Sequence, residues 1–121
     1  MDESRKWELE RDVEKKLLEG VRALGGKAIK WVAPGTAGVP DRIIIAPPGV
    51  VCFVEVKRNS GELSALQKKQ IDYLRALGAK VYVLWGMSDV KRFLDVLSRV
   101  CYERKQANHG IQTVQLPDIL Y

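Results

Sequence analysis

The segment from Gly38 to Lys57 constrains this chain most, because it combines two apolar runs with charged residues at their ends. Residues 43–45 and 50–54 are rich in β-branched side chains. The Ala-Pro-Pro-Gly sequence between them is typical of a tight turn. We therefore predict an antiparallel hairpin whose second strand runs on into a Glu-Val-Lys sequence.

The predicted hairpin brings three charged residues to one end of a small sheet. Glu55 and Lys57 are two positions apart, so they project from the same face of the second strand. Asp41 precedes the first strand, and antiparallel pairing places it beside the end of the second. Burying unpaired charges costs several kcal/mol each, so the cluster needs compensation from pairing or from a metal ion. Carboxylate oxygens suit a hard divalent cation such as Mg²⁺ or Mn²⁺.

A first helix is predicted from about residue 4 to residue 24, because apolar residues recur at spacings of three and four and two glycines follow. Glu10 falls one turn before Val13 and so lies on the apolar side, where a third carboxylate of the site would be expected. Glu14 lies at the border of that side. The alternative, which the pattern alone favours, is that Glu10 pairs with a basic residue one turn away.

The remaining elements define the fold class. They are a strand at 27–32, a helix at 63–77, a strand at 80–84 and a helix at 88–102. A strand, helix and strand in succession imply a right-handed crossover, so the last strand should run parallel to the Glu-Val-Lys strand. The predicted fold is α/β with the order αβββαβα, a mixed sheet flanked by helices.

The helix at 63–77 has a predicted apolar, inward side made by Leu63, Leu66, Ile71, Leu74 and Leu77. Gln67 lies on this side too, four residues after Leu63 and seven before Leu74. A buried amide needs hydrogen-bond partners, and the charged end of the hairpin is the nearest source of them. The alternative is that Gln67 is a boundary residue without a role in the site.

The chain length of 121 residues fits one domain, with a core at about 8–102 and an extension at 103–121. Within the extension, residues 111–116 are either a short edge strand or a segment docked on a second subunit, and His109 is assigned no role. Lys and Arg outnumber Asp and Glu by 20 to 15, which favours a polyanionic partner without naming one. The chain has no apolar run long enough for a membrane span and no signal peptide, so we expect a cytoplasmic protein.

Pro40-Asp41 followed by Glu55-Val56-Lys57 resembles the motif of the PD-(D/E)XK nucleases, which have the restriction-endonuclease-like fold. The wider context is similar to the VRR-NUC branch of that superfamily, found in stand-alone phage proteins and in a DNA-repair nuclease. The residues that carry this likeness are Gly38-Val39-Pro40-Asp41-Arg42, Phe53-Val54-Glu55-Val56-Lys57, Gly61, Leu63, Ser64 and Gln67. The resemblance covers about residues 10–85 and leaves the last stretch unexplained.

The resemblance implies a metal-dependent nuclease that hydrolyses phosphodiester bonds in DNA. Asp41, Glu55 and the main-chain carbonyl of Val56 would hold one or two Mg²⁺ or Mn²⁺ ions. Lys57 would position or help to deprotonate the attacking water, or would stabilise charge in the transition state.

The family also carries an acidic residue on the first helix and a glutamine on the second. Glu10 fits the acidic position best, as a metal ligand or an outer-shell group, and Glu14 stays an alternative. Gln67 fits the glutamine position, where it would fix a water molecule or Lys57.

The implied partner is DNA, in particular branched DNA such as four-way (Holliday) junctions or flaps. The resemblance to stand-alone members of this size implies a homodimer. We expect it to be encoded by a phage or prophage and to act in the bacterial host cell. We expect no organic cofactor and no membrane partner. Two alternatives stay open. One is a catalytically inactive nucleic-acid-binding module with the same fold, and the other is a structural protein whose charged residues merely pair.

Overall fold

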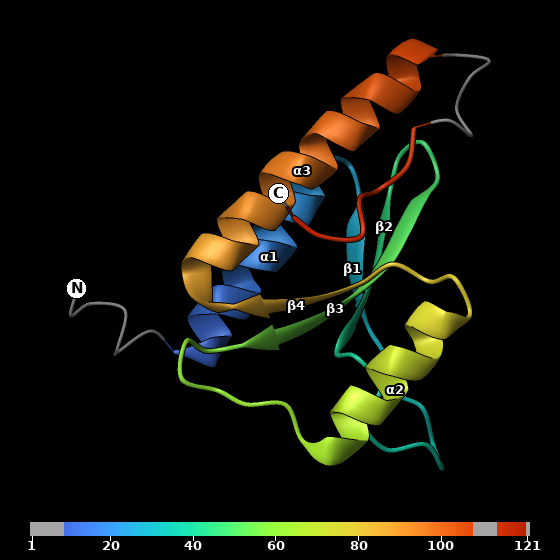
Figure 1. Cartoon of the computed structure of the whole chain (residues 1–121). Helices are drawn as coiled ribbons and strands as arrows, with labels where there is room; N and C mark the ends of the chain where they lie inside the picture. The colour runs from blue at the N-terminus through green and yellow to red at the C-terminus, as the bar shows by residue number, and fades with distance from the viewer. Residues whose placement is uncertain (1–8, 108–113, 121) are drawn as a thin grey trace.

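The computed structural model of the chain describes residues 9–107 and 114–120. Within these residues it contains helices and strands in the predicted order αβββαβα, which confirms the α/β fold class (Figure 1). The elements are α1 (Glu10–Ala23), β1 (Lys27–Lys30), β2 (Arg42–Ala46), β3 (Val50–Lys57), α2 (Ala65–Ala76), β4 (Val81–Trp85) and α3 (Gly86–Ala107).

The strands form one mixed sheet in the order β1-β2-β3-β4. β2 and β3 are the predicted antiparallel hairpin, with Ala46 paired to Val50 across the turn. β4 pairs parallel to β3, with Val83 opposite Glu55. The helix between them therefore makes the crossover that the sequence predicts.

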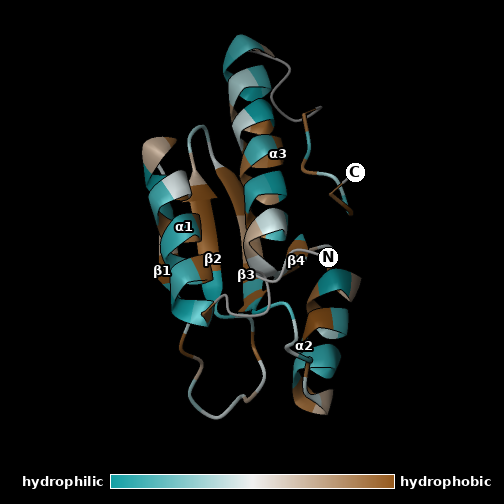
Figure 2. Ribbon diagram, turned by 90° about the vertical axis from the view of Figure 1, so that its left-hand side faces the viewer, coloured by the Kyte–Doolittle hydropathy of each residue, from teal (hydrophilic) through white to brown (hydrophobic). Residues whose placement is uncertain are grey.

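The hydrophobic core lies between one face of the sheet and the pair of helices α1 and α3, which lie side by side (Figures 1 and 2). Side chains alternate along a strand, so the inward residues of β3 are Val50, Cys52, Val54 and Val56, all fully buried. Glu55 and Lys57 consequently project from the opposite face. The core packing thus decides on which face the charged residues lie.

Helix α2 lies on that opposite face, near β4 (Figure 1). Among the apolar residues predicted to face inward from this helix, only Ile71 is fully buried. Leu66 and Leu77 are 52% and 68% exposed. The predicted apolar side is therefore wrong at these two positions, because α2 packs on the sheet with one side and no second element among the described residues covers it there.

Helix α3 runs from Gly86 to Ala107, beyond both ends of the predicted helix at 88–102. Its buried side continues through Val100 and Cys101, so packing supports the helix almost to the end of the predicted range. Arg104 anchors the last turns, since its guanidinium donates to the carbonyls of Val114 and Gly49 at 2.7 and 3.2 Å.

The described C-terminal residues, 114–120, contain no strand. Leu116 is buried in the core of its own chain, and the hydroxyl of Tyr82 donates to the carbonyl of Pro117. The part of the expected edge strand at 111–116 that is described is therefore an irregular segment that docks on this same chain. Residues 111–113, His109 and the first residues of the predicted first helix lie outside the described residues. Over the described parts of the chain, no helix has the length and apolar character needed to cross a bilayer.

Candidate active site

The hairpin register sets the positions of the acidic residues. Arg42 is paired with Val54, so the preceding residue, Asp41, lies next to the end of β3. The backbone N–H of Val56 donates to Oδ2 of Asp41 at 3.1 Å, which fixes the orientation of this half-buried carboxylate. Asp41 and Glu55 therefore meet at one edge of the sheet, as the sequence predicts.

Glu55 is 2% exposed, and its two carboxylate oxygens have different surroundings. Oε2 accepts a hydrogen bond from Nε2 of Gln67 at 3.1 Å and lies 3.6 Å from Nζ of Lys57. Oε1 is buried and has no hydrogen-bond partner among the described residues. A buried acceptor without a partner is costly, so Oε1 is suited to receive a cation.

The environment of Glu55 also changes its protonation. The pKa of Glu55 is raised from 4.5 to about 7, chiefly by burial and next by the charge of the nearby Asp41 carboxylate, while Lys57 opposes the shift. Two carboxylates in one poorly solvated site disfavour each other's charge. A bound cation would relieve this repulsion and favour the carboxylate form.

Gln67 is held at the site by the start of α2. Its backbone N–H donates to Oγ of Ser64 at 3.1 Å, and its Oε1 accepts from the backbone N–H of Ser64 at 2.8 Å. This capping box satisfies two backbone donors that would otherwise have no partner at the helix start. The same side chain directs its amide nitrogen at Glu55, whereas we expected it to fix a water molecule or Lys57. The Ser-x-x-Gln spacing is the sequence signal that identifies Ser64 as part of this arrangement.

Gly38 lets the loop before Asp41 approach α2 closely. Its φ is +89°, and a Cβ at this position would lie 2.6 Å from the carbonyl oxygen of Leu66 and 3.0 Å from the backbone nitrogen of Gln67. Any other residue would therefore be strained in its backbone and would clash with backbone atoms. This contact holds the first turn of α2 against the loop that carries Asp41.

Glu10 and Glu14, the two candidate acidic residues of α1, differ in how far they are buried. Glu10 is exposed, so its predicted inward position is wrong: α1 begins at this residue, and its buried side begins at Val13. Glu14 is half-buried and lies 3.7 Å from the guanidinium of Arg42. Within the residues that the structure describes, no third His, Cys, Asp or Glu completes a metal-binding group. The first turn of α1 nevertheless lies near the edge of the sheet where β3 and β4 end (Figure 1).

The family model of the VRR-NUC domain matches residues 6–102, a range that includes every site residue named above. The chain is 43% identical over 75 residues to "Putative nuclease p44" of Acyrthosiphon pisum secondary endosymbiont phage 1, over 62% of this chain and 81% of that protein. A solved structure described as a VRR-NUC domain has a TM-score of 0.67 and 33% identity, covering 71% of this chain and 94% of its own.

Proposed function

Because this chain belongs to the VRR-NUC domain family and is therefore a nuclease, we propose that it hydrolyses phosphodiester bonds in DNA with Mg²⁺ or Mn²⁺ as its cofactor. The observation that carries this proposal is the Glu55 carboxylate beside Asp41. One of its oxygens is buried without a hydrogen-bond partner among the described residues. A hard divalent cation fits such an oxygen-rich position.

Asp41, Glu55 and the main-chain carbonyl of Val56 would hold the cation. The N–H of Val56 points to Asp41, and the N–H and C=O of one strand residue point to the same side, so this carbonyl also faces Asp41. When bound, the cation lowers the pKa of a water molecule and neutralises charge that develops on the phosphate. Glu10 is proposed to act from α1 through an intervening water, since its side chain is exposed.

Lys57 and Gln67 prepare the site from the protein side. The side chain of Lys57 is 17% exposed and lies 3.6 Å from Glu55, so its ammonium is held next to the carboxylates. It would orient the attacking water or stabilise charge on the phosphate in the transition state. Gln67 fixes the rotamer of Glu55 through its amide.

We propose branched DNA as the substrate and a homodimer as the active form. The face of the sheet that carries Glu55 and Lys57 also carries exposed apolar side chains. Ile29 and Ile45 are each 42% exposed and Val51 is 49% exposed. Burying this patch against a second copy would exclude apolar surface from water and would give a two-fold symmetric pair of sites suited to a four-way junction. Sedimentation of wild type and Val51→Lys tests this arrangement, since a dimer closed by this patch should dissociate in the variant.

A cleavage assay tests the proposed function. Labelled duplex, single strand, 5′ flap, fork and four-way junction are incubated with the protein and Mg²⁺, Mn²⁺ or EDTA. We expect metal-dependent cutting that is lost in Asp41→Ala, Glu55→Ala and Lys57→Ala and kept in Asp95→Ala, an exposed acidic residue of α3. Cutting by all three site variants would overturn the assignment. DNA binding without cutting by the wild type would favour a catalytically inactive binding module.

A further inference from the structure

Trp85 is a residue beside the proposed active site that the function above does not use. It ends β4 and is paired with Lys57 of β3 in the parallel ladder. Neighbouring strands lie about 4.8 Å apart, and paired residues project from the same face. The indole of Trp85 therefore lies next to Lys57 on the face that carries Glu55, and the residue is 37% exposed.

Trp85 is held in place by one hydrogen bond from its indole ring and one from its backbone. Its Nε1–H donates to the carbonyl of Gly61 at 2.9 Å, and the backbone N–H of Trp85 donates to Oδ2 of Asp89 at 2.9 Å. Gly61 also lies beside Lys57, since a Cβ at Gly61 would lie 3.4 Å from Cβ and Cδ of that lysine. One loop residue therefore binds the indole and lies next to Lys57. A ring fixed in this way loses little conformational freedom when it binds a ligand.

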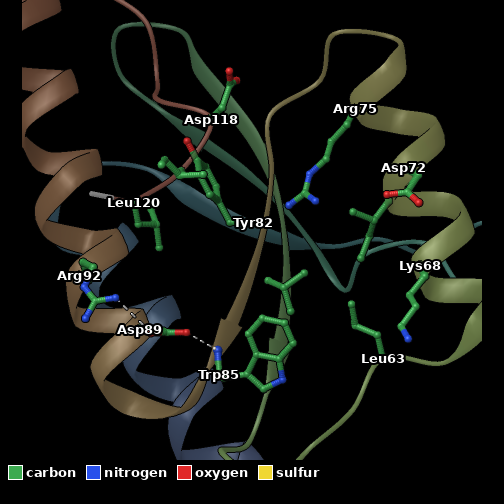
Figure 3. Close-up of a pocket in the computed structure, with 13 residues that line it drawn as sticks. Leu63, Lys68, Asp72, Arg75, Tyr82, Trp85, Asp89, Arg92, Asp118 and Leu120 are labelled. Atoms are coloured by element: carbon green, nitrogen blue, oxygen red, sulfur yellow. Dashed lines mark hydrogen bonds and ion pairs between the residues drawn. The ribbon is translucent and has the colours of Figure 1, made fainter.

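The ring borders a hollow of about 460 Å³ between α2, β4, the start of α3 and the C-terminal segment. Trp85 and Leu63 lie at one end of this hollow, and Tyr82 and Arg75 lie toward the other (Figure 3). Its volume is in the range of small-molecule binding sites.

The charges that line the hollow are balanced. They comprise three cations and three anions, namely Lys68, Arg75, Arg92, Asp72, Asp89 and Asp118. Asp89 is paired with Arg92 at 3.6 Å. Asp118 is paired with Lys80. A hollow with an aromatic wall and balanced charge suits a planar, uncharged group better than a phosphate.

We propose that Trp85 stacks on the base of an unpaired nucleotide adjacent to the phosphate that is cleaved. This inference rests on the proposed function, because it assumes that the scissile phosphate lies at Lys57 and Glu55. The base next to that phosphate lies within the length of one nucleotide of β4, the β-strand that neighbours β3 and carries Trp85. Bases within an intact duplex are stacked on each other and are not available to the ring. Stacking on an aromatic side chain is tolerant of sequence, so the preference is for unpaired DNA near the cut and not for a particular base.

A binding experiment tests this stacking. The Asp41→Ala protein, which we expect to bind without cutting, is titrated with a flap and with a matched duplex. Each DNA carries 2-aminopurine next to the cleavage position mapped with the wild type. Stacking on an indole quenches 2-aminopurine fluorescence, so we expect quenching with the flap and little change with the duplex.

Two substitutions in the Asp41→Ala protein separate the contribution of the aromatic face to binding from that of side-chain volume. Trp85→Leu and Trp85→Phe both lose the hydrogen bond to Gly61, but only phenylalanine keeps an aromatic face. We expect Trp85→Leu to bind the flap about 5- to 100-fold more weakly and without quenching, and Trp85→Phe to keep most of both. Tyr102→Ala, which removes a 65% exposed aromatic residue of α3, should change neither.

The outcomes distinguish this inference from the proposed function. Absence of cleavage of any DNA by the wild type would overturn the proposed function, and with it this inference. Cleavage by the wild type together with flap binding and quenching that persist in Trp85→Leu would overturn the stacking alone. Equal losses of flap and duplex binding in Trp85→Leu and Trp85→Phe would likewise overturn it, because they would assign Trp85 a purely structural role. Quenching of free 2-aminopurine nucleotide as strong as that of the flap would show a mononucleotide site instead.

Discussion

The side-chain amide of Gln67 donates a hydrogen bond to Glu55 over 3.1 Å, and this bond joins the first turn of α2 to the end of β3. Gln67 also caps its own helix through Ser64. The bond between the Gln67 side-chain oxygen and Ser64 fixes the rotamer of Gln67. In this rotamer the side-chain NH₂ group points to the carboxylate of Glu55. Helix start and proposed metal site are thus linked through one side chain.

Substitution of Gln67 separates these two roles. We expect Gln67→Met to lower both the free energy of unfolding, by about 1 kcal/mol, and the affinity for Mg²⁺ or Mn²⁺, because the side-chain half of the capping box and the support of Glu55 are both lost. Ser64→Ala should lower stability by a similar amount with a smaller loss of metal affinity. Urea unfolding and calorimetric metal titration measure the two quantities. Equal metal affinity in Gln67→Met and wild type would contradict the role in the site.

The stability of the metal-free protein should depend on the protonation of Glu55. The pKa of Glu55 is raised from 4.5 to about 7 in the folded state. Its contribution to the free energy of unfolding is therefore fully present below pH 4.5 and is lost as pH rises through about 7. We therefore expect Glu55→Gln to be more stable than wild type at pH 8, by on the order of 1–3 kcal/mol, and the gain to shrink toward pH 5. Urea unfolding in EDTA across this pH range measures the difference. The exposed Glu62→Gln should show no such trend, and a gain for Glu55→Gln that is independent of pH would contradict the expectation.

Metal binding should depend on pH for the same reason. A cation binds the carboxylate and competes with the proton on Glu55, so the affinity for Mg²⁺ should be higher at pH 8 than at pH 6. Cation at a fixed concentration of about a hundred times its Kd at pH 8 should stabilise the folded protein by about 2.7 kcal/mol at that pH and by less at pH 6. Thermal unfolding with and without the cation at both pH values measures this, and an equal shift of Tm at pH 6 and pH 8 would argue against Glu55 as a ligand.

Gly38→Ala should weaken the contact between the loop before Asp41 and α2. A Cβ would lie 2.6 Å from the carbonyl of Leu66, and the φ of +89° disfavours any side chain. Gly35→Ala is a matched control, since Gly35 has a φ of +81° but no atom within 4 Å of the added Cβ. We expect a cost of about 1–3 kcal/mol from strain in both variants and an additional cost, with reduced DNA cleavage, in Gly38→Ala alone. Equal stability and activity of the two variants would show that the close approach is unimportant.

Glu10 and Glu14 should respond differently to substitution. Glu14 is paired with the half-buried Arg42, so Glu14→Gln should lower the free energy of unfolding by about 1 kcal/mol. Glu10 is exposed, so Glu10→Gln should leave stability within about 0.5 kcal/mol and, if it acts at the site through water, should reduce cleavage. Unfolding and cleavage measurements on both variants assign the roles. Unchanged cleavage in Glu10→Gln would remove this residue from the proposed site.

The sequence by itself determined the hairpin, the order of the elements and the convergence of Asp41, Glu55 and Lys57. Strand alternation and turn residues are properties of short segments, and they place Glu55 and Lys57 on one face and Asp41 beside them at one edge of the sheet. Its position on the apolar side of a helix made Gln67 a candidate, and the resemblance to the VRR-NUC domain favoured a role in the site.

Only the tertiary structure decided how the site is completed. The pairing of Glu14 with Arg42 and the buried oxygen of Glu55 without a partner depend on how α1 and α2 pack on the sheet. The fixed ring of Trp85 depends in the same way on a loop that follows β3. The periodicity of one helix shows which side is apolar, but it does not show how much of that side a neighbour covers. Burial, ion pairing and exposure arise from contacts between segments distant in sequence, so the sequence pattern gave candidates and the packing selected among them.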